Sequence, residues 1–249
     1  GAPSGDAAGS MPLDRPAAWY ATPEARRIAD VIVSFQTPAG GWSKNAPRTT
    51  PRRPGQAYGD AGYLGTLDND ATVTELRFLA RVVTAGAPAF RDSFERGVRW
   101  LLAAQYPNGG WPQVFPLAGG YHDAVTFNDD AMTAALGLLG EVASGQGDYA
   151  FADPRLRAEA QAAWRRGVAA LLKAQVVKDG RPTGWPQQAD ALNLAPVGAR
   201  NFEPAALAST ESAGILAYLR TLAPSPDVAR AIDGGSAWLR ATALKDKAW

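Results

Sequence analysis

The chain has 249 residues, of which 46% are hydrophobic and none is cysteine, and its formal net charge at pH 7 is +1. A chain of this size can bury roughly 70–75% of its unfolded surface, and it needs no disulfide framework. The near-neutral charge argues against nucleic acid as a partner, and no apolar run reaches the roughly 18–20 residues that span a membrane.

Residues 1–18 are small and polar, and we expect them to form a flexible N-terminal segment. They lack the charged and apolar parts of a signal peptide, so the protein is either cytosolic or has already lost a signal. Thr22, Pro23 and Glu24 then supply a cap residue, a proline at the first helical position and an acid in the first turn. This pattern predicts a helix that runs to about Gln36.

The chain repeats itself after this helix. The sequence Gly-Gly-Trp or Gly-Trp recurs at Trp42, Trp111 and Trp185. A glutamine ends the helix expected before each of them, and these glutamines, Gln36, Gln105 and Gln175, lie 69 and 70 residues apart. A fourth copy begins near Trp238. Such a period indicates a structural repeat.

Helical spacing is shared between the copies. Apolar residues recur at i, i+3 and i+4 in the first helix of each unit and again in the second, as in the sets Val98, Leu101, Leu102; Val73, Leu76, Ala80, Val83; Met132, Ala135, Leu136, Leu139; and Ile215, Tyr218, Leu219, Leu222. The sequence therefore predicts an all-α fold of repeated helical hairpins, either an open solenoid or a closed α/α toroid. We favour the toroid, which would form one domain over residues 19–249. The second helices begin with polar residues, as if these helix starts meet at one open end of a ring.

The second helices begin with clusters of acids and amides. Asp68, Asn69 and Asp70 precede one, and Asn128, Asp129 and Asp130 precede the next. Residues of these types ordinarily cap helix N-termini, which is the structural interpretation. Two clusters at equivalent points of a repeat also suit calcium, which takes six to eight oxygen ligands. Two or three carboxylates hold it weakly, so a ligand with its own carboxylate would complete the shell.

The Gly-Gly-Trp loops also have a structural interpretation, in which glycines end the helices and tryptophans plug the hairpins. Amides and charged donors beside aromatic faces bind hydroxyl-rich sugars, which makes these loops candidates for a saccharide groove. The candidate substrate-binding residues are Lys44, Asn45, Asn69, Trp111, Gln113, Asn128, Gln187 and Glu203.

Arg200 lies three residues before Glu203 and shortly before the third inner helix. It could pair with Glu203 on the surface or form a fork for a substrate carboxylate. His122, the only histidine, is interpreted as structural. No nucleophile elbow, phosphate loop or zinc-type histidine cluster is present.

Together, GGWSKN, TLDNDATVTELRFLARV, YPNGGWPQVFP, TFNDDAM, GWPQQ, ARNFEP and STESAGIL resemble the family 10 polysaccharide lyases, which are pectate lyases with an (α/α)₃ toroid. The resemblance runs from about residue 25 to about residue 222. It implies β-elimination of polygalacturonate with Ca²⁺ as cofactor, in a monomeric, secreted protein that is extracellular or periplasmic. In this chemistry the cation and arginines neutralise the uronate carboxylate and a base removes the proton at C5.

The resemblance also implies roles for individual residues. Asp129, with Asp130 beside it, is similar to the main calcium-binding aspartate, Asp68 to a second acid that joins once substrate is bound, and Arg200 to a substrate-binding arginine. Family members continue with a Trp-Ala-Arg-Phe-Tyr motif whose arginine is the proposed base, and this chain lacks that motif, so we expect a C-terminal part to be missing. Arg200 and Asp68 are the catalytic candidates present, although the high pKa of arginine makes it a poor base.

Two other functions fit parts of the sequence. The run from Arg96 through Gln105 to Trp111 resembles the QW repeat of triterpene cyclases, another α/α toroid class, but the Asp-x-Asp-Asp acid of those enzymes is absent. A non-catalytic helical domain that binds acidic polysaccharide or a protein is the third possibility.

Overall fold

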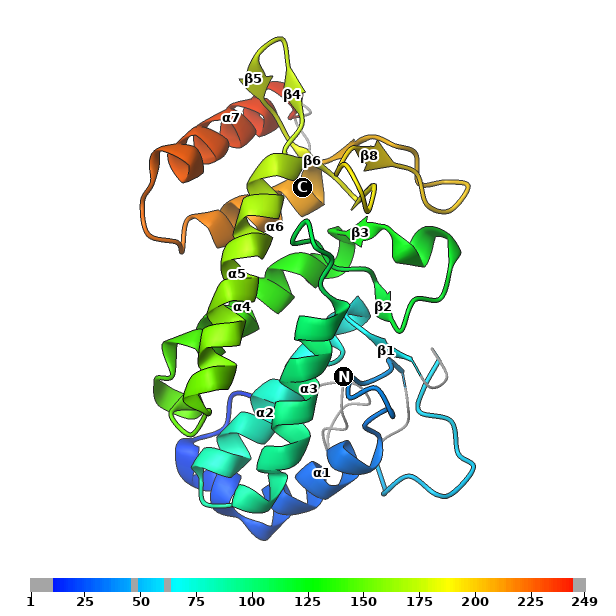
Figure 1. Cartoon of the computed structure of the whole chain (residues 1–249), viewed down its shortest axis with the longest axis vertical. Helices are drawn as coiled ribbons and strands as arrows, with labels where there is room; N and C mark the ends of the chain where they lie inside the picture. The colour runs from blue at the N-terminus through cyan, green and yellow to red at the C-terminus, as the bar shows by residue number, and fades with distance from the viewer. Residues whose placement is uncertain (1–10, 46–48, 61–63, 244–249) are drawn as a thin grey trace.

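The structure, a computed structural model, describes residues 11–45, 49–60 and 64–243, and it is mostly helical (Figure 1). The α-helices are α1 (Pro23–Ser34), α2 (Val73–Thr84), α3 (Arg91–Ala104), α4 (Ala131–Ser144), α5 (Pro154–Ala174), α6 (Ser209–Leu219) and α7 (Pro226–Thr242). Among these residues, none of the helices combines the length and the apolar character that crossing a bilayer requires.

Three of the long helices begin in the same way. Thr22, Asp153 and Ser225 each accept a hydrogen bond from a backbone N–H of the first turn, and a proline follows each of them. These caps satisfy N–H groups that have no partner within the helix. The predicted start of α1 is confirmed, and its end lies two residues before the predicted Gln36.

The helices pack in two layers. In one layer α2 contacts α4 and α4 contacts α6, while in the other α3 contacts α5 and α5 contacts α7. Helices joined by short connections, α2 with α3, α4 with α5 and α6 with α7, pack across the layers. The predicted apolar stripes face this interface: Val73, Leu76, Leu136, Leu139 and Ile215 are all buried. Leu222, which the pattern placed in the last helix of this set, lies beyond the end of α6.

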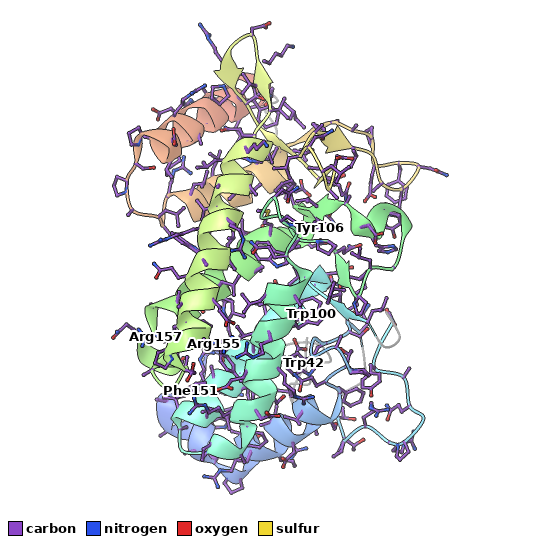
Figure 2. All side chains as sticks on the ribbon, viewed as in Figure 1. Trp42, Trp100, Tyr106, Phe151, Arg155 and Arg157 are labelled. Carbon is purple, nitrogen blue, oxygen red and sulfur yellow. The ribbon has the colours of Figure 1, made fainter. Side chains whose placement is uncertain are left out.

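The tryptophans of the repeat are structural. Trp42, Trp111 and Trp185 have no exposed surface, and each indole N–H donates to a carbonyl oxygen near the end of the preceding helix, at 2.8, 2.8 and 2.7 Å respectively. Figure 2 shows Trp42 beside α3, in the same part of the molecule as Trp100. A buried indole needs one hydrogen-bond acceptor, and the repeat supplies it three times.

The glutamines that mark the repeat tie neighbouring units together. The side-chain amides of Gln36, Gln105 and Gln175 each donate to two carbonyl oxygens, one in the following loop and one in the first helix of the next unit. These bonds are 2.7–3.0 Å long. Each loop is therefore fixed to its own helix and to the next unit at once.

Short strands join loops from different units. They are β1 (Gly65–Thr66), β2 (Val114–Phe115), β3 (Val125–Thr126), β4 (Val177–Lys178), β5 (Arg181–Pro182), β6 (Trp185–Pro186), β7 (Gln188–Ala189), β8 (Pro196–Val197) and β9 (Leu207–Ala208). All pairs are antiparallel: β1 with β2, β3 with β7, β7 with β8, β4 with β5 and β6 with β9. In Figure 1, β1, β2, β3 and β8 lie on one side of the helices.

The N-terminal segment is described from Met11 onward. Met11 and Leu13 pack against the hydrophobic core, and the Tyr20 hydroxyl donates to the carbonyl oxygen of Pro12 at 2.9 Å. The rest of the predicted flexible segment, residues 1–10, lies outside the described residues. The 3₁₀ helices are η1 (Ala17–Ala21), η2 (Asp68–Asp70), η3 (Pro88–Phe90), η4 (Gly120–Asp123), η5 (Asn128–Asp130) and η6 (Gly147–Tyr149).

Candidate active site

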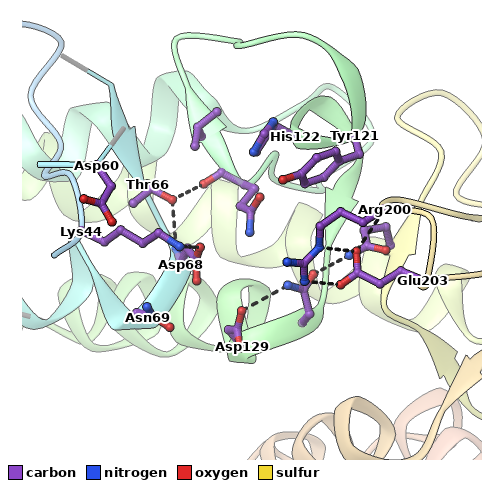
Figure 3. A pocket seen from close by; sticks show the side chains of 14 residues that line it. Lys44, Asp60, Thr66, Asp68, Asn69, Tyr121, His122, Asp129, Arg200 and Glu203 are labelled. Carbon is purple, nitrogen blue, oxygen red and sulfur yellow. Dashed lines mark hydrogen bonds and ion pairs between the residues drawn. The ribbon is translucent and has the colours of Figure 1, made fainter. Parts of the chain in front are cut away.

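A polar cavity of 340 Å³ lies where the starts of α2 and α4 meet the cross-unit strands. Its lining combines acids, amides, aromatic rings and two cations (Figure 3). The lining residues are Lys44, Asp60, Thr66, Asp68, Asn69, Gln113, Val114, Tyr121, His122, Asn128, Asp129, Gln188, Arg200 and Glu203.

Two left-handed turns present the acids. η2 and η5 contact each other, and within them Asn69 and Asp129 have φ angles of 50° and 54°. Asn and Asp tolerate this conformation better than other residues with a side chain, and such strain gathers at functional sites. Cross-unit bonds hold the turns, because Gln113 O accepts from the Leu67 N–H at 3.1 Å and Gln187 O from the Phe127 N–H at 2.8 Å.

These acids do not cap the helices. The N-cap residues of η2, η5, α2 and α4 make no capping hydrogen bond with their side chains. At the start of η2 the Asp68 N–H donates to the Thr66 hydroxyl instead, at 3.1 Å. The structural interpretation of the clusters as helix caps is therefore wrong. The reason is that the backbone leaves helical geometry directly before each helix, with φ angles of 54–69° at Asp70 and Thr72 before α2 and at Asp129 and Asp130 before α4.

The acidic wall holds Asp68 and Asp129. Asp68 is buried and forms an ion pair with Lys44 (Figure 3). Partial burial raises the pKa of Asp129 above its ordinary value, and the negative charge of Asp68 raises it further. A hydrogen bond of 3.2 Å from the Asn128 amide acts in the opposite direction. Two carboxylates that repel each other in one cavity form a place where a cation would be stabilised.

Arg200 and Glu203 form the opposite wall. The guanidinium donates to both carboxylate oxygens of Glu203, at 3.0 and 2.6 Å, and lies over the Phe202 ring at 4.5 Å. The hydrogen bond to Glu203 raises the pKa of Arg200 above its ordinary value. The same contact holds the pKa of Glu203 below its ordinary value. The Arg200 side chain is still 52% exposed, so part of the guanidinium remains accessible to a ligand.

The donor set fits calcium only when a ligand contributes. In the described part of the chain, no three or more histidine, cysteine, aspartate and glutamate side chains are grouped to hold a metal. Asp68 and Asp129 supply carboxylate oxygens from adjacent turns, and amide oxygens such as that of Asn69 line the same cavity. Hard oxygen donors of this kind suit calcium, and a substrate carboxylate would raise the ligand number.

Eight of the predicted site residues line this cavity: Lys44, Asp68, Asn69, Gln113, Asn128, Asp129, Arg200 and Glu203. They come from loops and turns of three repeat units, which the cross-unit strands bring together. The third helix start, at Ser209, Thr210 and Glu211, does not line the cavity. Of the polar helix starts that were expected to converge on one mouth, the first two therefore line this cavity and the third does not.

Four other predicted residues lie outside the cavity lining. Asn45 donates to the Asp60 carboxylate at 2.7 Å, and Gln187 to Glu211 at 3.5 Å. Trp111 is fully buried, so it has no exposed ring face for a sugar. The Asp130 carboxylate lies beside Gly214 of α6, where it would be 2.6 Å from an added Cβ. These positions support an indirect role for the four residues rather than contact with a ligand in the cavity.

Sequence reasoning missed Asp60, Thr66, Tyr121, Val114 and Gln188, and it interpreted His122 as structural although it lines the cavity. The Tyr121 and His122 rings stack at 3.9 Å. Asp60 and Tyr121 lie in loops without helical periodicity, so no spacing marked them. Gln188 directly follows the predicted residue Gln187, and of the two only Gln188 lines the cavity.

A profile of the family described as pectic acid lyase matches residues 36–249. The chain is similar to the solved structure of a family 10 polysaccharide lyase from Cellvibrio cellulosa, with a TM-score of 0.77 and 35% identity, over 93% of this chain and 73% of that chain. It is similar to an aspartate-to-alanine mutant of that family from the same organism in complex with trigalacturonic acid, with the same score and identity over 92% and 72%. No curated protein matches. The chain belongs to the pectic acid lyase family.

Proposed function

We propose that the protein cleaves α-1,4-polygalacturonate by calcium-assisted β-elimination in the cavity between Asp68, Asp129 and Arg200. The observation that carries this proposal is the pairing of two adjacent carboxylates with an accessible guanidinium across one polar cavity. The relative solved with trigalacturonic acid supports the same class of substrate.

In this reaction a base takes the proton from C5 of a galacturonate residue, α to its carboxylate. A C4–C5 double bond forms, the C4–O4 bond breaks, and the departing 4-linked sugar takes up a proton from water. Charge builds up on the carboxylate as the proton leaves, so the protein must stabilise an enolate-like dianion. Calcium held by Asp68 and Asp129 would neutralise part of this charge and thereby make the C5 proton more acidic.

Arg200 binds the uronate carboxylate in this proposal. Its planar fork matches a carboxylate, and part of the guanidinium is accessible. Glu203 orients the guanidinium through two hydrogen bonds and keeps it protonated, since the pKa of Arg200 is raised by this contact. A raised pKa disfavours proton abstraction, so we assign Arg200 to binding rather than to the role of base.

The overall architecture that we propose is the (α/α)₃ toroid over residues 19–249. The three-fold repetition of glutamine, buried tryptophan and paired helices supports it. We also propose that the protein acts as a monomer outside the cytoplasm, where pectate would meet it.

The direct test is the ultraviolet absorbance of the unsaturated product during incubation with polygalacturonate. We expect a rise with calcium and none after chelation by EGTA. The lyase proposal would be overturned if neither this chain nor the protein encoded by the complete gene forms the product. Binding of polygalacturonate without product would instead favour a non-catalytic polysaccharide-binding domain.

A further inference from the structure

Gln188 is a buried amide with an unusual set of contacts. It belongs to β7, is only 4% exposed and lines the cavity. Its Nε2 donates to Oδ1 of Asn128 at 2.8 Å. Its Oε1 is buried and accepts no hydrogen bond from the described residues. A buried acceptor without a protein partner is unfavourable for folding, so folding stability alone does not favour glutamine at this position.

The repeat shows that packing does not require an amide here. β1 pairs with β2 so that Thr66 faces Val114, and β3 pairs with β7 so that Thr126 faces Gln188. Val114 and Gln188 therefore occupy equivalent positions beside equivalent turns, and both are buried. Valine fills this position in one unit, whereas the unit beside Asp129 carries glutamine.

The contacts of Gln188 define the polarity of a short chain of amides. Nε2 can only donate, so it binds Oδ1 of Asn128 and leaves Nδ2 of Asn128 to donate to the Asp129 carboxylate at 3.2 Å. If the Asn128 amide alone were reversed, its oxygen would face the carboxylate and its nitrogen would face the Gln188 nitrogen. Both contacts would then be repulsive.

We propose that Gln188 is a positioning residue that orients the Asp129 carboxylate for a divalent cation by fixing the Asn128 amide. The inference rests on the proposed function, in which Asp129 holds calcium. Groups that orient a metal ligand in this way commonly change metal affinity 10–100-fold when they are lost. Gln188 thus acts without touching the cation.

The test is a terbium titration of the intact protein, with luminescence sensitised by its aromatic residues and calcium as competitor. Gln188→Met keeps the length and volume of the side chain and removes the donor, and we expect it to weaken terbium and calcium binding about tenfold or more. The matched control is Gln175→Met, because Gln175 is also a buried glutamine but binds carbonyl oxygens of the repeat away from the cavity. It should lower the melting temperature and leave the terbium midpoint unchanged.

A double variant separates positioning from a general loss of structure. In an Asn128→Ala background Gln188 has no amide to fix, so Gln188→Met should cause no further loss of terbium affinity. An unchanged midpoint in Gln188→Met, or a full additional loss in the double variant, would overturn the inference alone. Failure of the wild-type protein to bind terbium or calcium would overturn the calcium part of the proposed function and the inference with it.

Discussion

Asp129 shows how one residue combines binding with a cost in stability. Its left-handed backbone and its partly buried carboxylate near Asp68 are both unfavourable for folding. The raised pKa means that the folded protein holds this proton more tightly than the unfolded chain. Stability is therefore lost as the pH rises from the ordinary pKa of an aspartate through the raised value, and the loss persists at neutral pH.

Asp129→Asn should consequently separate activity from stability. We expect lyase activity to fall about a hundredfold or more, because the carboxylate that would hold the cation is lost. Without calcium, the variant should be at least as stable as the wild type at neutral pH and should have no advantage below the ordinary aspartate pKa. Urea denaturation in EGTA, at neutral pH and at a pH below the ordinary aspartate pKa, measures the free energy of unfolding of both proteins. A variant clearly less stable than the wild type at neutral pH would contradict the raised pKa of Asp129.

Arg200→Ala tests recognition of the substrate carboxylate. The accessible part of the guanidinium should bind free galacturonate, whereas a methyl ester removes the charge that it recognises. We expect KM for polygalacturonate to rise about tenfold or more, with a smaller effect on highly methylated pectin.

Arg155→Ala is the control for Arg200→Ala. Arg155 lies on α5 away from the cavity and forms an exposed ion pair with Glu159 at 2.9 Å (Figure 2). Exposed pairs of this kind contribute about 0–1 kcal/mol, so activity on both substrates should stay unchanged. Equal losses on charged and methylated substrates in Arg200→Ala would count against carboxylate recognition.

At the scale of elements, the Gly-Gly-Trp loops depend on close backbone approach as much as on glycine's freedom. Gly109 has a φ of +97°, and a Cβ there would lie 2.1 Å from the carbonyl oxygen of Arg166 in α5. Gly86, just beyond α2, has a similar φ of +103° with nothing within 4 Å of such a Cβ. Substitution at Gly86 therefore tests backbone strain alone, whereas substitution at Gly109 tests strain together with contact with the next unit.

Gly86→Ala should cost about 1–2 kcal/mol of stability, from the unfavourable φ alone. Gly109→Ala should cost about 1–3 kcal/mol more, because α5 must move away from the loop. The free energy of unfolding from urea titrations provides the comparison. Equal losses at the two positions would mean that the loop does not fix the spacing between units.

The sequence predicted the elements better than it predicted the site. Helical spacing and the glutamine and tryptophan repeats are local signals, so the helices and the structural role of the tryptophans could be read from them. The capping interpretation failed because the shape of each acidic turn depends on residues one unit further along the chain. The Asn128 N–H, for example, donates to the carbonyl oxygen of Gln187. Such pairing over about 60 residues leaves no periodic mark in the sequence.

For the whole molecule, family membership overturns the triterpene-cyclase alternative and confirms the resemblance to pectate lyases. The repeat then has a functional explanation. Equivalent turns in two units contact each other and hold Asp68 and Asp129 in one cavity, although sixty positions separate the turns in the sequence. The glutamine ties make each unit depend on its neighbour, as in other repeat proteins. Loss of one of these ties should therefore lower the stability of the unit beside it as well as that of its own unit.

The cavity wall has a consequence for how a polyanion approaches it. Of the described side chains that line it, Asp60, Asp68, Asp129 and Glu203 are acids, against the cations Lys44 and Arg200. Without a divalent cation, this excess of negative charge should repel galacturonate chains, and salt at about 0.1 M, with a Debye length of about 10 Å, should weaken the repulsion.

Trigalacturonic acid should therefore bind more tightly, by calorimetry in EGTA, when sodium chloride is added, and binding that weakens with salt would contradict this expectation. In calcium this salt dependence should be much smaller, because one divalent cation brings the net charge of these six side chains to zero. The supply of divalent cation would then control the rate of capture as well as the rate of bond cleavage.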